Sequence, residues 1–156
     1  MATDEPANAV PLVDLLAESS IRLDAHASGR DDAIGQAGAL LVEAGAVDER
    51  YPDAMLQREN RISTYVGEGV AIPHGTLAGN GAVTRDAIVV LRFPDGVDWD
   101  GHDVRVVVGI AAKGNGHIAL LSQLATILLD SERANALRAA TTSEQVYQVL
   151  APDDEE

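Results

Sequence analysis

Residues 65–75 read Tyr65-Val66-Gly67-Glu68-Gly69-Val70-Ala71-Ile72-Pro73-His74-Gly75, and the rest of the chain is organised around them. A short apolar run from Val70 to Ile72 ends in Pro73, which fixes its own φ and restricts Ile72 to an extended conformation. Glycines on both sides allow tight turns and close backbone approach. The stretch therefore predicts a strand that presents His74 on a backbone with little freedom. Such a histidine suits catalysis, but it is equally typical of an ordinary strand-to-loop exit.

The composition is that of a single globular domain. The chain has 156 residues, of which 46% are hydrophobic and only 3% aromatic, so Ala, Val, Leu and Ile must build the core. The absence of cysteine excludes disulfides, thiolate metal sites and a cysteine nucleophile. No apolar stretch approaches the roughly 18 residues of a spanning helix, and the N-terminus is acidic rather than basic. We expect a soluble, cytoplasmic protein.

The charge balance is strongly acidic. The formal net charge is −14, from 25 acidic and 11 basic residues, and Lys113 is the only lysine. Such a surface would be repelled by the phosphates of nucleic acid. The acids are spread along the chain, which favours adaptation to high salt, where charge repulsion is screened to within about 3 Å at 1 M. An acidic patch for a basic partner and a GC-rich source without salt adaptation are the alternatives.

Hydrophobic periodicity and capping residues predict an α/β domain with helix-rich ends around a strand-rich middle. Two β-branched runs of strand length are typical of strands covered on both faces, and the turn signal between them permits antiparallel pairing in a mixed sheet. The expected strands are at 21–23, 85–93 and 104–112, with a turn at Pro94-Asp95-Gly96 between the last two. The expected helices run from 28–32 to about 44, ended by Gly45, from 51 to 61 with Pro52 in the first turn, and from 118 to 129. Two more follow, one capped by Ser131 and ending at about 139, and one capped by Thr142 or Ser143 and ending at about 150. The domain is expected to span residues 12–150, between a flexible tail at 1–11 and an acidic tail at 151–156.

Four histidines are the candidates for chemistry. His74 and His117 share a context, because each lies at a glycine-flanked junction, one after a strand and one at a helix start. His26 and His102 neighbour aspartates in polar segments, and we interpret them as solvated loop residues. His74 and His117 are therefore the pair to explain.

Other functions for this pair find little support. A zinc site would need a third ligand such as Glu68 or Asp86, and no HExxH spacing is present. No GxSxG motif indicates a serine hydrolase. The glycine-rich turn at residues 114–116 lacks the lysine and the spacing of a phosphate-binding P-loop.

A histidine can also act as the nucleophile itself. A phosphorylated histidine needs cationic or N–H donors for the phosphoryl oxygens, and one ring nitrogen fixed by a hydrogen bond so that the other is unprotonated. Arg58, His117 and the N–H groups at the start of its helix are candidate donors. Arg58 could equally pair with Glu59 or Glu68, and His117 could merely cap a helix.

Two segments together resemble a known signature. Met55-Leu56-Gln57-Arg58-Glu59, followed by Ser63-Thr64 and residues 65–75, looks like the signature of the enzyme IIA domains of the mannitol/fructose type. These domains belong to the bacterial sugar phosphotransferase system. The resemblance continues through residues 107–112 and 115–117 into the following helix, and it covers about residues 12 to 150.

The resemblance implies a role for each matching residue. His74 matches the histidine that accepts a phosphoryl group from the phosphocarrier HPr and passes it to a IIB domain of a IIBC permease. His117 matches the second active-site histidine, and Arg58 matches the arginine that supports the phosphorylated state. The implied fold is a single-domain α/β sandwich with a mixed, mostly parallel central sheet flanked by helices. The family needs no metal and no organic cofactor.

The sequence leaves three members of the family open: a fructose- or mannitol-type transport component, a nitrogen-branch regulatory phosphoprotein, and a fragment of a larger fused protein. Thr64-Tyr65 and Gly75-Thr76 look more like the mannitol-type signature, and both chain ends suggest a freestanding subunit. Because the phosphotransferase systems of halophilic archaea are known mostly for fructose uptake, the salt-adapted interpretation places fructose first.

Overall fold

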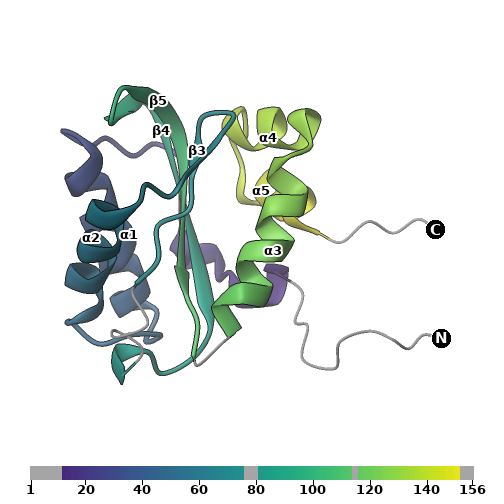
Figure 1. Cartoon of the computed structure of the whole chain (residues 1–156). Coiled ribbons are helices and arrows are strands. Elements are labelled where there is room, and N and C mark those ends of the chain that lie inside the picture. Colours follow the sequence, from purple (N-terminus) through teal and green to yellow (C-terminus); the bar gives the residue numbers. More distant parts are fainter. Residues whose placement is uncertain (1–11, 76–80, 114–115, 152–156) are drawn as a thin grey trace.

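The computed structural model describes residues 12–75, 81–113 and 116–151, and for residues 116–118 it describes the backbone alone. A five-stranded sheet stands between two layers of helices, with α1 and α2 on one face and α3, α4 and α5 on the other (Figure 1). The predicted single-domain α/β sandwich is confirmed. None of the helices in the described ranges is long and apolar enough to cross a membrane.

The sheet is mixed, with the strand order β1-β4-β5-β3-β2. Its central β4–β5 pair is antiparallel, as is the β2–β3 hairpin at one edge, whereas β1 runs parallel to β4 and β3 runs parallel to β5. The strands are β1 (Ile21–Arg22), β2 (Tyr65–Gly67), β3 (Val70–Ala71), β4 (Ala87–Trp99) and β5 (His102–Ala111).

The helices begin and end close to the predicted residues. They are α1 (Arg30–Glu43), α2 (Tyr51–Arg61), α3 (Gly116–Leu128), α4 (Ser131–Arg138) and α5 (Ser143–Leu150), with short 3₁₀ helices at Leu12–Leu15 and Glu18–Ser20. One predicted cap is wrong by a residue: Asp130, not Ser131, caps α4, because its carboxylate accepts a hydrogen bond from the Glu132 N–H. The Thr142 cap of α5 is confirmed by the bond that its side chain accepts from the Gln145 N–H.

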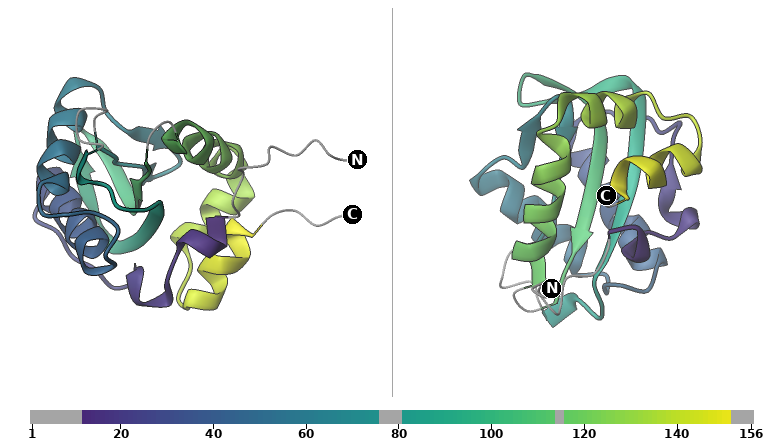
Figure 2. Two further views of the ribbon diagram at one scale, coloured as in Figure 1. Left: turned by 90° about the horizontal axis from the view of Figure 1, so that it is seen from below. Right: turned by 90° about the vertical axis from the view of Figure 1, so that its right-hand side faces the viewer.

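The apolar runs of β4 and β5 are buried on both faces, as predicted. Along β4, Val89 and Leu91 join the hydrophobic cluster under α1 and α2. Ile88 and Val90, the alternate residues, join the cluster under α3, α4 and α5. The view in Figure 2 (left) shows the sheet edge-on between these two layers. This alternation follows from the two-residue period of a strand.

The turn between β4 and β5 lies at residues 100–101, beyond the predicted position at residues 94–96. Pro94-Asp95-Gly96 falls inside β4, where an irregularity in the β4–β5 register absorbs it. The chain reverses instead at Asp100 and Gly101, whose φ angles of +55° and +94° lie in the left-handed region, and Trp99 pairs with His102 across this two-residue loop. An Asp-Gly pair suits such a loop because both central residues need positive φ. The segment Pro94-Asp95-Gly96 therefore forms a bulge within the long strand β4 and not a turn.

We expect alanine substitutions at Gly101 and Gly35 to have opposite effects on stability. An added Cβ meets no heavy atom within 4 Å at either position. At Gly101 the positive φ disfavours alanine, so the free energy of unfolding should fall by about 1–2 kcal/mol. At Gly35, inside α1, alanine should raise it by about 0.5–1 kcal/mol. Denaturant unfolding measures both values, and a stabilised Gly101→Ala protein would contradict the hairpin geometry.

Candidate functional site

His74 lies where β3 leaves the sheet. Its backbone forms a parallel bridge with Ile110 of β5, and the Ile110 N–H donates to the Pro73 carbonyl at 3.0 Å. Only 7% of the His74 residue surface is exposed. The strand exit expected from the sequence is thus present, and the imidazole is held in a largely buried position.

The His74 ring has a defined tautomer. Its Nδ1 lies 2.9 Å from the Ile72 carbonyl oxygen. A carbonyl oxygen can only accept, so Nδ1 carries the hydrogen, and the neutral ring keeps its lone pair on Nε2. One ring nitrogen is therefore fixed by a hydrogen bond and the other is the nucleophilic one, as phosphorylation of a histidine requires.

Tyr51, the first residue of α2, fixes the backbone on either side of this ring. Its hydroxyl donates to the Ile110 carbonyl at 2.7 Å and accepts from the Gly75 N–H at 2.8 Å. A Cβ on Gly75 would lie 2.5 Å from Tyr51 Cε1, so the close approach of the ring requires glycine there. Sequence reasoning missed Tyr51, although a tyrosine at the start of a helix in a chain with only three tyrosines was a usable signal.

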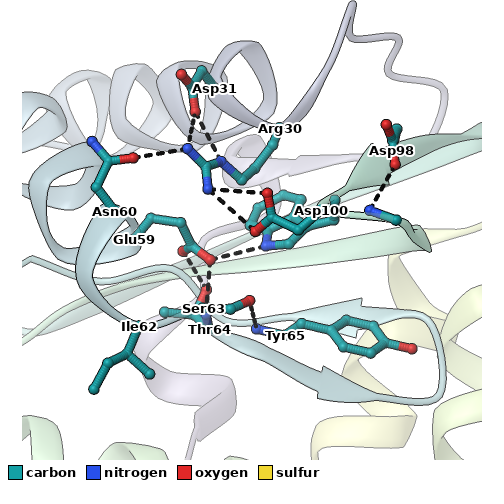
Figure 3. Close-up of polar contacts among 12 residues, drawn as sticks. Arg30, Asp31, Glu59, Asn60, Ile62, Ser63, Thr64, Tyr65, Asp98 and Asp100 are labelled. Atoms are coloured by element: carbon teal, nitrogen blue, oxygen red, sulfur yellow. Dashed lines mark hydrogen bonds and ion pairs between the residues drawn. The ribbon is translucent and has the colours of Figure 1, made fainter.

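Glu59 is a second residue whose role sequence reasoning missed. It is 2% exposed, and its carboxylate accepts from the Thr64 N–H at 2.7 Å, the Thr64 hydroxyl at 2.6 Å and the Trp99 indole N–H at 2.9 Å (Figure 3). No cation of the described residues forms an ion pair with it. The Thr64 carbonyl in turn accepts from the Ile72 N–H at 3.0 Å. Glu59 therefore connects α2 and the β4–β5 hairpin to the segment that carries His74.

Arg30, Asp100 and Asn60 form a polar cluster near the buried Glu59 carboxylate (Figure 3). Arg30 at the start of α1 donates to the carboxylate of Asp100 in the hairpin loop at 3.2 Å and to the Asn60 side-chain oxygen at 2.9 Å (Figure 3). The cluster ties α1, the end of α2 and the β4–β5 loop together over the buried Glu59 carboxylate.

Arg58 pairs with neither Glu59 nor Glu68. Its guanidinium donates to the Ile62 carbonyl at 2.6 Å, just beyond the end of α2. The Arg58 side chain therefore reaches from α2 to the loop that leads to Thr64, whose carbonyl accepts from the Ile72 N–H of the His74 segment. A role for Arg58 toward a phosphoryl group stays a prediction.

His117 is the second residue of α3, and its side chain lies outside the described part of the molecule. The helix starts five residues after the end of β5. Ile110, the bridge partner of His74, is the second-last residue of β5. The start of α3 and His74 therefore lie at the same end of the sheet. Asn115, which the resemblance also used, is outside the described residues.

The ligands considered for a metal are engaged elsewhere. Glu68 accepts a hydrogen bond from Ser131 and pairs with Arg138, and Asp86 accepts from the Lys113 N–H. Across the described ranges, no group of three or more His, Asp or Glu side chains could hold a metal ion.

The two remaining histidines are exposed. His26 lies in a loop, with Nδ1 3.2 Å from the Asp95 carboxylate. The prediction that His102 lies in a loop is wrong: it is the first residue of β5, because the turn lies at Asp100 and Gly101. Its ring stacks on Tyr65, with the ring centroids 4.3 Å apart.

Removing the Tyr51 hydroxyl should loosen the His74 segment. We expect Tyr51→Phe to lower the free energy of unfolding by about 1–3 kcal/mol, since a buried carbonyl and a partly buried N–H lose the hydroxyl as a partner. Hydrogen exchange at the Gly75 amide should become faster. Tyr147→Phe is the matched control, because it loses one bond to the Leu16 carbonyl away from this site. Unchanged protection of Gly75 in Tyr51→Phe would contradict the role given to Tyr51.

Tyr51 should also make the protein less stable in alkali. Burial raises the pKa of Tyr51 above its ordinary value of 10.0, and the Gly75 N–H offsets this only in part. The unfolded chain then releases the proton first, so this stabilisation is present below about pH 10 and is lost as the pH rises through the higher folded-state pKa. Urea unfolding between about pH 9 and pH 11 should show a steeper loss in the native sequence than in Tyr51→Phe. Parallel slopes would show that Tyr51 does not titrate differently on folding.

Comparison with known proteins agrees with the resemblance drawn from the signature residues. Residues 14–152 match the family described as phosphoenolpyruvate-dependent sugar phosphotransferase system, EIIA 2. The chain is 39% identical over 141 residues to the mannitol-specific phosphotransferase enzyme IIA component of Staphylococcus aureus, which covers 90% of this chain and 98% of that protein. It is also 39% identical over 155 residues to the mannitol-specific EIICBA component of Pasteurella multocida, covering 97% of this chain and 24% of that protein.

The fold gives the same result. It matches enzyme IIA of the mannitol system of Escherichia coli, solved in complex with phosphorylated enzyme IIB, with a TM-score of 0.81 and 34% identity over 87% of this chain and 98% of that one. The identification of the family from sequence is confirmed. This chain belongs to the EIIA 2 family of the phosphoenolpyruvate-dependent sugar phosphotransferase system.

Proposed function

We propose that this chain is the phosphoryl carrier of a mannitol-type phosphotransferase system. It accepts a phosphoryl group from phospho-HPr on Nε2 of His74 and passes it to a IIB domain, which serves a IIBC permease. The observation that carries this assignment is the hydrogen bond from His74 Nδ1–H to the Ile72 carbonyl, which leaves the lone pair of the neutral ring on Nε2. The carrier acts in the cytoplasm, and its working part lies within residues 12–150.

Sequence identity to mannitol-specific relatives supports mannitol over fructose as the sugar of this system. The relatives in Staphylococcus aureus and Pasteurella multocida are both mannitol-specific, at 39% identity. This agrees with the mannitol-like residues around His74 and outweighs the preference for fructose that rested on the acidic surface. The same identities favour transport over a regulatory role of the nitrogen branch.

The mechanism follows from the orientation of the ring. In the first step the lone pair of His74 Nε2 attacks phosphorus in line, and the bond from phosphorus to the HPr nitrogen breaks. In the second step a sulfur nucleophile of IIB attacks phosphorus, and the bond to Nε2 breaks. The proton on Nδ1 stays on its hydrogen bond to Ile72 throughout. The protein therefore mainly positions the ring and stabilises charge on the phosphoryl oxygens.

Two residues are proposed to supply that stabilisation. Arg58 lies in the last turn of α2, and turning its guanidinium from the Ile62 carbonyl toward the phosphoryl oxygens would exchange a neutral acceptor for a charged one. His117 stands in the first turn of α3, where N–H groups and the helix dipole favour an anion.

Substitution of the histidines tests these roles. With phospho-HPr as donor, His74→Ala should take up no phosphate, because the nucleophile is gone. His117→Ala should still be phosphorylated but should transfer to IIB at least about tenfold more slowly, since loss of one charge-stabilising group commonly has such an effect. Labelled phosphate on the protein, followed by chase with IIB, measures both steps.

The exposed histidines provide the control. His26→Ala and His102→Ala should accept and transfer phosphate at the native rates, and the assays should be run in both high and low salt because partner docking depends on charge. Phosphate on the His74→Ala protein would refute the assignment.

A further inference from the structure

A cavity of about 490 Å³ lies at the opposite end of the sheet from His74. It is formed by the tip of the β2–β3 hairpin, the middle of β4, the start of β5 and the end of α4. Gly69, which lines it, precedes β3, whereas His74 follows β3, so about five residues of extended chain, roughly 16 Å, separate the two. The proposed phosphoryl transfer makes no use of this cavity.

Three arginines line this cavity, in a chain that carries 25 acidic and only 11 basic residues. Arg92 is held by backbone carbonyls: its Nε donates to the Arg138 carbonyl at 3.0 Å and its Nη1 to the Leu23 carbonyl at 3.1 Å. No carboxylate of the described residues pairs with it. Arg92 therefore brings a positive charge to the cavity, and no acidic side chain among the described residues pairs with that charge.

The other two arginines have carboxylate partners on the cavity wall. Arg105 donates from Nε to Asp103 at 2.9 Å and from Nη1 to the Pro94 carbonyl at 2.8 Å. Arg138 donates to the backbone carbonyl of Glu68, and its Nη1 lies 3.6 Å from the Glu68 carboxylate. Two carboxylates thus face three guanidinium groups. In the described part of the chain, neither Nη2 of Arg92 nor Nη2 of Arg105 has a protein acceptor.

We propose that this cavity binds a small phosphate ester, such as a sugar phosphate. Guanidinium groups present N–H donors in a planar fork that matches phosphate oxygens, and Nη2 of Arg92 and Arg105 supply such donors here. The cavity lies in the range of about 300–1,000 Å³ that is usual for small-molecule sites and has room for more than an inorganic phosphate ion. Pro94, which is partly exposed, gives it an apolar surface against which the organic part can rest.

The site can be tested by titrating the ¹⁵N-labelled chain with inorganic phosphate and, separately, with glucose 6-phosphate, at about 0.1 M ionic strength. The variants are Arg92→Gln and Arg105→Gln, with Arg50→Gln as the matched control. Arg50 pairs with Asp48 on an exposed surface outside the cavity, and its loss changes the net charge of the chain by the same amount.

We expect saturable binding with amide shifts at Gly69 and Arg105, and tighter binding of the ester than of inorganic phosphate. Arg92→Gln and Arg105→Gln should each weaken binding at least tenfold, and Arg50→Gln should change it less than twofold. His74→Ala should bind as the native chain does, which separates this site from the proposed phosphoryl site.

Three results would overturn the proposal: no saturable shift at millimolar ester, equal weakening by Arg50→Gln, or shifts confined to residues around Gly75. Thermal unfolding of each variant accompanies the titrations, because Arg92 also holds two backbone carbonyls. If Arg92→Gln does not fold, Arg105→Gln decides, since both of the Arg105 contacts, to Asp103 and to the Pro94 carbonyl, are exposed.

Discussion

The carboxylate of Glu59 is the interaction on which the surrounding structure depends. A buried carboxylate is costly unless hydrogen bonds replace its water, and here an amide, a hydroxyl and an indole N–H do so. The donors come from Thr64 and Trp99, so the carboxylate fixes the end of α2 relative to the β2 edge and the β4–β5 hairpin. Because Thr64 also pairs with Ile72, the position of Glu59 is transmitted to the strand that leads to His74.

Helix α2 holds the His74 segment from both of its ends. Glu59 acts near its C-terminus, and Tyr51, its first residue, bonds to the backbone of Ile110 and Gly75. Phosphoryl transfer between two proteins needs the accepting nitrogen in a fixed place, because most of the catalysis is positioning. The His74 ring, fixed by its own Nδ1 bond on a backbone held at several points, meets this need of the proposed transfer.

Much of the fold could be predicted because its signals are local. The two-sided apolar runs of β4 and β5, the periodicity of α1 and the Pro52 start of α2 each depend on a few neighbouring residues. The predicted turn position was wrong because the residues Pro94-Asp95-Gly96 favour a turn more strongly than Asp100-Gly101 does. The strand continues past Gly96 to Trp99, which is buried and donates to Glu59. The cap of α4 was wrong by one residue because Asp130 and Ser131 are both good caps and lie side by side.

The sequence by itself determined that His74 ends a constrained strand, that Arg58 and Glu59 precede it at a family-specific spacing, and that the chain is one acidic α/β domain. Only the tertiary structure decided what Glu59 and Tyr51 do. Their partners lie far along the chain, 40 residues away for Trp99 and 59 for Ile110, and hydrogen bonds over such separations depend on how the sheet and helices pack. The same holds for the arginines of the cavity, which converge from β4, β5 and α4. A strand exit is encoded by neighbouring residues, whereas the environment of a side chain is created by residues that only folding brings near.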